Sequence, residues 1–181
     1  MMTRLFGLFK RWYREETAVA ATEAAMIFPL LLTFLLGTLD MGYGILAAQK
    51  TIRASQVTAD LIARHKTVTA ADIDDAIAAG QLSLVPFAAG TYGVDVVSIR
   101  FDSNSNPQPL WRDTRNMTPN AVVLSSLRNL GLGVEGEGIV AVTSQYDYKP
   151  IFSGFIVNAM RFQEVSYVRG RLSSTIPMQG G

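Results

Sequence analysis

The sequence has no cysteine and a single histidine, His65. Without cysteine there are no disulfides, no thiolate metal sites and no cysteine nucleophiles, so packing alone must hold the fold. A single imidazole also leaves no Ser/His/Asp set and no metal-ligand spacing to assemble, and no pair of carboxylates stands out. We therefore expect a protein that is not an enzyme and that holds no metal and no cofactor, with His65 solvated at a helix end.

Stripes of basic residues are missing as well. Beyond the N-terminal region, Lys and Arg occur singly or in pairs without interleaved aromatics, and the 181 residues carry a net charge of only +1. Nucleic-acid binding requires a basic face. We expect no nucleic-acid partner.

Charge is scarcest between Ala18 and Leu39, where Glu23 is the only charged residue in an otherwise apolar or small run. About 20 apolar residues are enough to cross a bilayer core as a helix. An ionisable residue inside such a segment is costly and rare, and by default it marks a functional site. Glu23 is therefore the residue to explain.

The region before this run is basic, with four cations against two carboxylates: Arg4, Lys10, Arg11, Arg14, Glu15 and Glu16. The positive-inside rule then places the N-terminus in the cytoplasm and the rest of the chain in the periplasm of a bacterium. We expect four segments: a basic cytoplasmic leader at 1–18, a transmembrane helix at 19–39, an extracytoplasmic continuation of that helix at 40–66, and a periplasmic domain at 67–181. The leader is either a short interfacial helix or a topogenic basic tail.

A cleaved secretory signal peptide is an alternative interpretation of the same region, with cleavage near Gly42 to Gly44. The apolar part of a signal peptide normally holds about 7–15 residues. Here the run is longer and contains both Glu23 and Pro29. These features favour a helix that is retained.

The run from Ala18 to Pro29 reads AVAATEAAMIFP, and a Leu-rich stretch then leads to Asp40, Met41, Gly42 and Tyr43. Together these residues resemble the N-terminal module of TadE-like proteins, the minor pilins or pseudopilins of the tight-adherence (Flp-type) pilus machinery. The shared pattern is a small residue, Glu, Pro, an apolar helix, and an acidic residue followed closely by Gly and an aromatic. The resemblance covers roughly residues 14 to 64.

This resemblance implies a processing site and a role for Glu23. A prepilin peptidase would cleave between Ala18 and Val19, although family members usually have Gly where this chain has the similarly small Ala18. Glu23 of one subunit would then pair with the N-terminal amine of a neighbouring subunit. From the residues alone, an alternative is that Glu23 lies near the cytoplasmic interface, within reach of Arg14 or lipid headgroups.

Five further positions are candidates for helix kinking and packing: Pro29, Gly37, Asp40, Gly42 and Gly44. Pro29 removes one backbone hydrogen bond inside the helix, which predicts a kink that membrane helices tolerate. The three glycines, with Ala47 and Ala48, form a small-residue surface suited to close contact with a partner helix.

Residues 45–64 contain no Gly or Pro and continue the helix beyond the apolar run. Mostly small residues recur at helical spacing and form one seam: Ile45, Ala48, Ile52, Ser55, Ala59 and Ile62. The seam packs either on the chain's own domain or on a partner in a pilus or complex.

The remaining sequence predicts an α+β domain with an antiparallel sheet of about four strands and one or two short helices. Thr69 and Asp72 predict a capping box for a helix at 70–79 that Gly80 closes. Strands are predicted at 94–101, 110–112, 139–148 and 162–171, with the third central in the sheet, a turn at 102–109, and a second helix running from Thr118 and Pro119 to Gly131.

Two segments of the domain require separate comment. Residues 131–136 match GxGxxG, but a helix is predicted before the motif and a strand after it, the reverse of a dinucleotide site, so a glycine-rich loop suffices. Residues 151–160, IFSGFIVNAM, are apolar yet too short to span a bilayer. They lie against the membrane surface or a partner, or they are core.

The sequence therefore predicts a non-enzymatic, single-pass protein of the bacterial inner membrane that takes part in Flp-type pilus assembly. The partners that the resemblance implies are other pilins or pseudopilins, inner-membrane pilus assembly proteins and prepilin peptidase, together with membrane lipid. The alternative is a membrane-tethered periplasmic module that binds a ligand or acts as a sensor.

Overall fold

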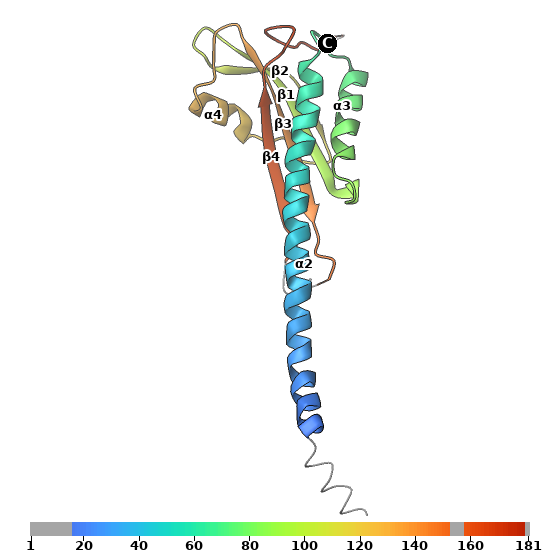
Figure 1. The fold of residues 1–181 in the computed structure, drawn as a ribbon. Coiled ribbons are helices and arrows are strands. Elements are labelled where there is room, and N and C mark those ends of the chain that lie inside the picture. The colour runs from blue at the N-terminus through green and yellow to red at the C-terminus, as the bar shows by residue number, and fades with distance from the viewer. Residues whose placement is uncertain (1–15, 153–157, 180–181) are drawn as a thin grey trace, which may run out of the picture. The chain divides into compact units, whose positions relative to one another are not determined.

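The computed structural model describes residues 16–152 and 158–179. It shows a long N-terminal helix followed by an α+β domain with a four-stranded antiparallel sheet and short helices (Figure 1). This architecture confirms the predicted fold class. The structure divides into two compact units, which we name the anchor unit (Met1–Gly42 with Pro150–Asn158) and the sheet unit (Tyr43–Lys149 with Ala159–Gly181).

Helix α2 (Glu16–Ala63) is one continuous helix of 48 residues, and it contributes residues to both units. Pro29 lies inside it without ending it. The hydroxyl of Thr33 donates a hydrogen bond to the Pro29 carbonyl at 2.8 Å. Thr38 donates to the Phe34 carbonyl in the same way, so both hydroxyls are satisfied within the helix.

The sheet consists of β1 (Tyr92–Phe101), β2 (Pro107–Arg115), β3 (Gly138–Tyr148) and β4 (Met160–Val168), in the order β2-β1-β3-β4. All neighbouring strands are antiparallel. The predicted central position of the third strand is confirmed, and β1 is central as well. Both strands are buried along almost their whole length.

Strand β2 is longer than the sequence predicts, because it begins at Pro107 inside the expected turn. Pro107 pairs with Phe101 at the end of the hairpin, and β2 is an edge strand. Proline is tolerated at the first residue of an edge strand, where its missing N–H breaks no ladder bond. The composition of residues 102–109 therefore predicted a turn where the structure has the first residues of β2.

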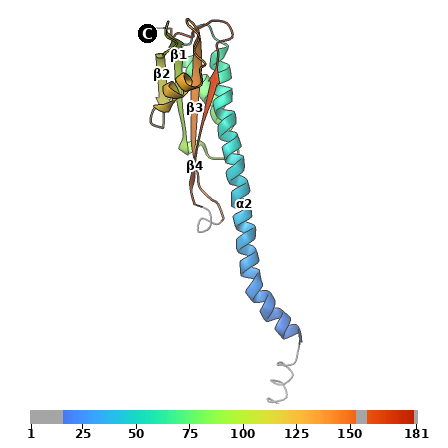
Figure 2. The same cartoon turned by 90° about the vertical axis from the view of Figure 1, so that its left-hand side faces the viewer.

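One face of the sheet is covered by the second half of α2 and by α3 (Ala70–Leu82), as Figure 1 shows and Figure 2 confirms for α2. The apolar core on this face includes Ile62, Ile73, Val94, Val96 and Val142. A short 3-10 helix, η1 (Ala89–Thr91), leads from this layer into β1.

Helix α3 begins as the sequence predicts, since Thr69 and Asp72 form a complete capping box. The predicted stop at Gly80 is wrong, because the helix continues through it to Leu82. Gly80 is buried, and a Cβ at this position would lie 3.0 Å from the Ala54 carbonyl oxygen and overlap the Thr58 hydroxyl. Gly80 thus permits α3 to pack closely on α2.

The opposite face of the sheet is covered by α4 (Val122–Asn129), whose Val123 and Leu127 are buried against Ile99 and Phe101 (Figure 1). The predicted start at Thr118 and Pro119 is too early. Asn120 is held outside the helix, since its backbone N–H donates to the Asp95 carboxylate at 2.9 Å.

The loop that carries GxGxxG lies between α4 and β3, as predicted. Gly131 and Gly136 have positive φ angles of 64° and 76°, which glycine adopts readily. At Gly133 a Cβ would lie 2.8 Å from the Ser105 carbonyl oxygen and 2.9 Å from the Phe101 ring. These glycines serve turns and close packing.

Candidate assembly site on helix α2

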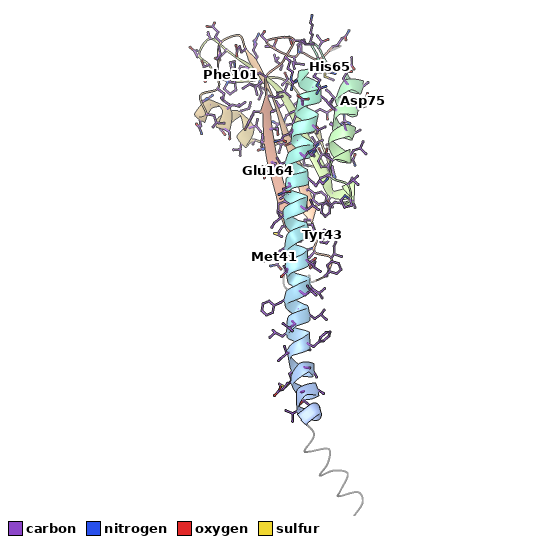
Figure 3. All side chains as sticks on the ribbon, in the orientation of Figure 1. Met41, Tyr43, His65, Asp75, Phe101 and Glu164 are labelled. Atoms are coloured by element: carbon purple, nitrogen blue, oxygen red, sulfur yellow. The ribbon has the colours of Figure 1, made fainter. Side chains whose placement is uncertain are left out.

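The first half of α2 exposes its apolar side chains instead of burying them (Figure 3). Large hydrophobic residues with more than a third of their surface exposed follow one another along it: Val19, Met26, Ile27, Phe28, Leu30, Leu31, Leu32, Phe34, Leu35 and Leu39. Among the described residues, one helix is long and apolar enough to cross a membrane, and its most apolar window has a mean hydropathy of 2.0 and no buried residue. This helix suggests membrane anchoring.

Glu23 lies on this exposed apolar stretch, one turn after Val19. The hydroxyl of Thr22 donates to the Val19 carbonyl at 2.7 Å and so is satisfied within the helix. None of the ion pairs formed between described residues includes Glu23. A carboxylate in apolar surroundings must be neutralised or find a cation, and the other residues that the structure describes supply no cation to Glu23.

Asp40 differs from its neighbours because it is fully buried, and nearby Gly37 is also buried. One carboxylate oxygen of Asp40 accepts hydrogen bonds from the backbone N–H groups of Ile151 and Phe152, at 2.8 and 3.1 Å. The second oxygen lies 3.2 Å from the Phe152 nitrogen. Sequence reasoning singled out Asp40 by position but missed this long-range contact, for which the sequence contains no signal.

The glycines near the end of the apolar run point in different directions. Gly44 is buried, and a Cβ there would lie 3.3 Å from Cε of Met160 and 3.6 Å from the Tyr148 ring. Gly42 is exposed, with nothing within 4 Å of a Cβ. The small-residue surface predicted for a partner helix is therefore divided: Gly44 and Ala47 pack on the chain's own sheet, and Gly42 does not.

The buried face of the later part of α2 also differs from the predicted seam, because it lies at a different angle around the helix. Ser55, Ala59 and Ile62 are buried in the sheet unit, but Ile45 and Ile52 are exposed. All but one of the residues that do face the sheet are small or polar, the exception being Ile62: Gly44, Ala47, Thr51, Ala54, Ser55, Thr58, Ala59 and Ile62. Threonine is tolerated there because its hydroxyl bonds to backbone, as Thr51 does to Ala47 at 2.9 Å.

The sheet unit contains one strongly buried charge, Asp95 on β1. Burial alone would raise the pKa of Asp95, but hydrogen bonds from Arg112, Thr114 and the Asn120 backbone hold the pKa below its usual value. Arg112 binds both carboxylate oxygens, at 2.8 and 2.5 Å. The cluster ties β1, β2 and the start of α4 together, and all of its partners are supplied from within the domain.

One open depression in the sheet unit has a volume of about 440 Å³. Its charged residues, Asp147 and Arg161, pair with each other at 2.6 Å, and the bond from Arg161 lowers the pKa of Asp147. Among residues 16–152 and 158–179, no group of three or more His, Cys, Asp or Glu side chains could hold a metal ion.

Comparison with known proteins bears on α2. Residues 18–60 match the family described as TadE-like protein. The match begins at Ala18, the residue before the predicted cleavage point, and ends within α2. No curated protein and no solved structure is similar enough to match. The TadE-like family implies a component associated with the Tad pilus and is not known as a family of enzymes.

Proposed function

We propose that this protein is a non-enzymatic, minor pilin-like or pseudopilin-like component required for assembly of a Flp-type pilus at the bacterial inner membrane. The observation that carries the proposal is Glu23, an exposed carboxylate on an exposed apolar helix at the start of the region that matches the TadE-like family. Such a carboxylate is costly in lipid without a cation, so its presence favours a partner.

The partner is the N-terminal amine of a neighbouring subunit. A prepilin peptidase would cut between Ala18 and Val19, creating a positive amine one helical turn before Glu23. Opposite charges attract strongly in an apolar medium, and each relieves the cost of burying the other. Pairing between subunits would therefore fix how far one helix is shifted along the next.

The expected topology follows from the charges around the anchor. The basic leader stays in the cytoplasm by the positive-inside rule, and the sheet unit lies in the periplasm. There the domain would meet other pilins or pseudopilins, while the apolar helix contacts lipid and the inner-membrane assembly proteins.

The test is replacement of Glu23 by Ala and by Gln in the full-length chain, with pilus assembly and membrane fractionation as readouts. Both variants should insert into the membrane as wild type does, because removing a charge makes insertion easier. Both should lose pilus assembly. Thr22→Ala is the matched control, since its hydroxyl bonds only to its own helix. Normal piliation in the Glu23 variants would refute the proposed role.

N-terminal sequencing of membrane-extracted protein tests the processing step independently. A mature chain that starts at Val19 supports the pilin-like role. An intact leader would instead support a plain anchor, and a start near Ile45 would support secretion.

A further inference from the structure

The contact between Asp40 and the backbone at Ile151 and Phe152 joins two segments more than a hundred residues apart in sequence. It lies within the anchor unit, the same unit as the apolar half of α2. Asp40 is fully buried, whereas Leu39 and Met41 on either side of it are 42% and 60% exposed. The backbone at Ile151 and Phe152 therefore covers one side of α2 at position 40.

The depth of this contact in a membrane follows from helix geometry. An α-helix rises about 1.5 Å per residue, so a hydrocarbon core about 30 Å thick takes about 20 residues. A core that begins at Val19 ends at about Leu39, and one that begins just after Glu23 ends at about Tyr43. Both registers place Asp40 at the outer boundary of the bilayer.

The residues held at this depth are apolar and exposed. Ile151 is 61% exposed and Phe152 is 46% exposed. Their backbone nitrogens lie within hydrogen-bond distance of the Asp40 carboxylate, so these residues share its depth. We propose that Ile151 and Phe152 insert into lipid at the outer boundary of the membrane, and that Asp40 is the residue that holds them on the anchor helix.

The chemistry of the contact suits that position. Backbone N–H groups cannot enter an apolar region without an acceptor, because the lipid offers none. A carboxylate accepts such bonds more strongly than a neutral group does. The backbone at Ile151 and Phe152 in turn covers the Asp40 charge and keeps it out of the hydrocarbon. The contact thus lowers two desolvation costs, that of the Asp40 carboxylate and that of the backbone N–H groups of Ile151 and Phe152.

The absence of cysteine makes a direct test straightforward, because a single introduced cysteine can be labelled without background. The full-length chain, reconstituted into phosphatidylethanolamine and phosphatidylglycerol vesicles, would carry an environment-sensitive NBD fluorophore at Ile151→Cys. Leu31→Cys and Leu172→Cys are matched controls, since the three side chains are 61%, 60% and 60% exposed. Leu31 lies in the apolar run and Leu172 in the sheet unit.

The fluorophore at position 151 should emit at shorter wavelength than at 172 and should be quenched by spin-labelled lipids, more by shallow than by deep labels. At position 31 deep labels should quench best. Emission at 151 typical of water would overturn the proposal. Emission typical of an apolar environment without quenching by spin-labelled lipid would overturn it too, because it indicates contact with a protein instead of lipid. Absence of quenching at 31 would also overturn the proposal, because the depth of Asp40 depends on the apolar half of α2 crossing the bilayer.

Asp40→Ala tests the holding role. Quenching at 151 should fall to the level seen at 172, while quenching at 31 is unchanged. Asp40→Asn keeps one acceptor oxygen, so it should retain more quenching at 151 than Asp40→Ala does. Equal quenching at 151 in wild type and both variants would refute the role of Asp40. The measurement involves no pilus assembly, so its outcome is independent of the proposed function.

Discussion

The hydroxyl of Thr58 on α2 occupies the space that a side chain at Gly80 on α3 would need. Thr58 donates from this hydroxyl to the Ala76 carbonyl at 3.1 Å, so the two helices are both in contact and hydrogen bonded. Thr58 is branched at Cβ, and of its two favoured rotamers in a helix it adopts the one that reaches the Ala76 carbonyl. The hydroxyl therefore cannot move aside without losing its bond.

Gly80→Ala should for this reason destabilise the sheet unit, even though alanine favours helix over glycine by about 1 kcal/mol. Overpacking a close contact costs about 1–3 kcal/mol, and here the neighbours are a backbone carbonyl and a stiff side chain. Thermal unfolding of the full-length chain in detergent, followed by circular dichroism, would measure the loss. Gly90→Ala is the control, because nothing lies within 4 Å of a Cβ there. A stabilised Gly80→Ala variant would mean that α2 and α3 pack less closely.

Arg112→Met should lower the free energy of unfolding by about 2 kcal/mol, because it leaves the buried Asp95 carboxylate without its cation. The loss is limited by Thr114 and the Asn120 N–H, which still donate to Asp95. The matched control is Arg161→Met, since Arg161 also binds its partner, Asp147, through two nitrogens. That pair is solvent-exposed, so its loss should change stability little. Equal effects of the two substitutions would contradict a buried role for Asp95.

Asp95 also predicts how stability depends on pH. An unfolded aspartate titrates near pH 3.9. The pKa of Asp95 in the folded chain is lower, so its contribution is fully present above that pH and is lost as the pH falls through the folded value. Asp95→Asn should destabilise the chain at neutral pH, and its deficit relative to wild type should shrink below about pH 4. Urea titrations at several pH values would measure this difference, and a constant deficit would argue against an ionised Asp95.

Gly44→Leu and Gly42→Leu should behave differently although the two positions are only two residues apart. At Gly44 a leucine would press on Met160 and Tyr148, and such overpacking costs about 1–3 kcal/mol. At Gly42 a Cβ has no described atom within 4 Å, so the effect on folding should be small. Comparison of their unfolding midpoints is the test. If Gly42→Leu were the more damaging variant, α2 would be rotated from the orientation described here.

The sequence by itself determined the elements whose signals are local. A long run with one charge predicts the apolar helix, alternation predicts β1 and β3, Thr69 and Asp72 predict the cap of α3, and the spacing of Ala18, Glu23 and Pro29 predicts the family. Each of these depends on residues close together in the chain, where the period of a helix or strand is visible. The processing site and the partner of Glu23 stay predictions.

Only the tertiary structure decided which side of α2 faces the sheet. Small and polar residues such as Gly44, Thr51 and Thr58 are buried there because their size and backbone-bonded hydroxyls permit close approach, whereas the more hydrophobic Ile45 and Ile52 are exposed. A hydrophobicity pattern cannot reveal such a face. The bond from Ile151 to Asp40 is equally invisible in the sequence, because it depends on where the chain after β3 returns to the helix.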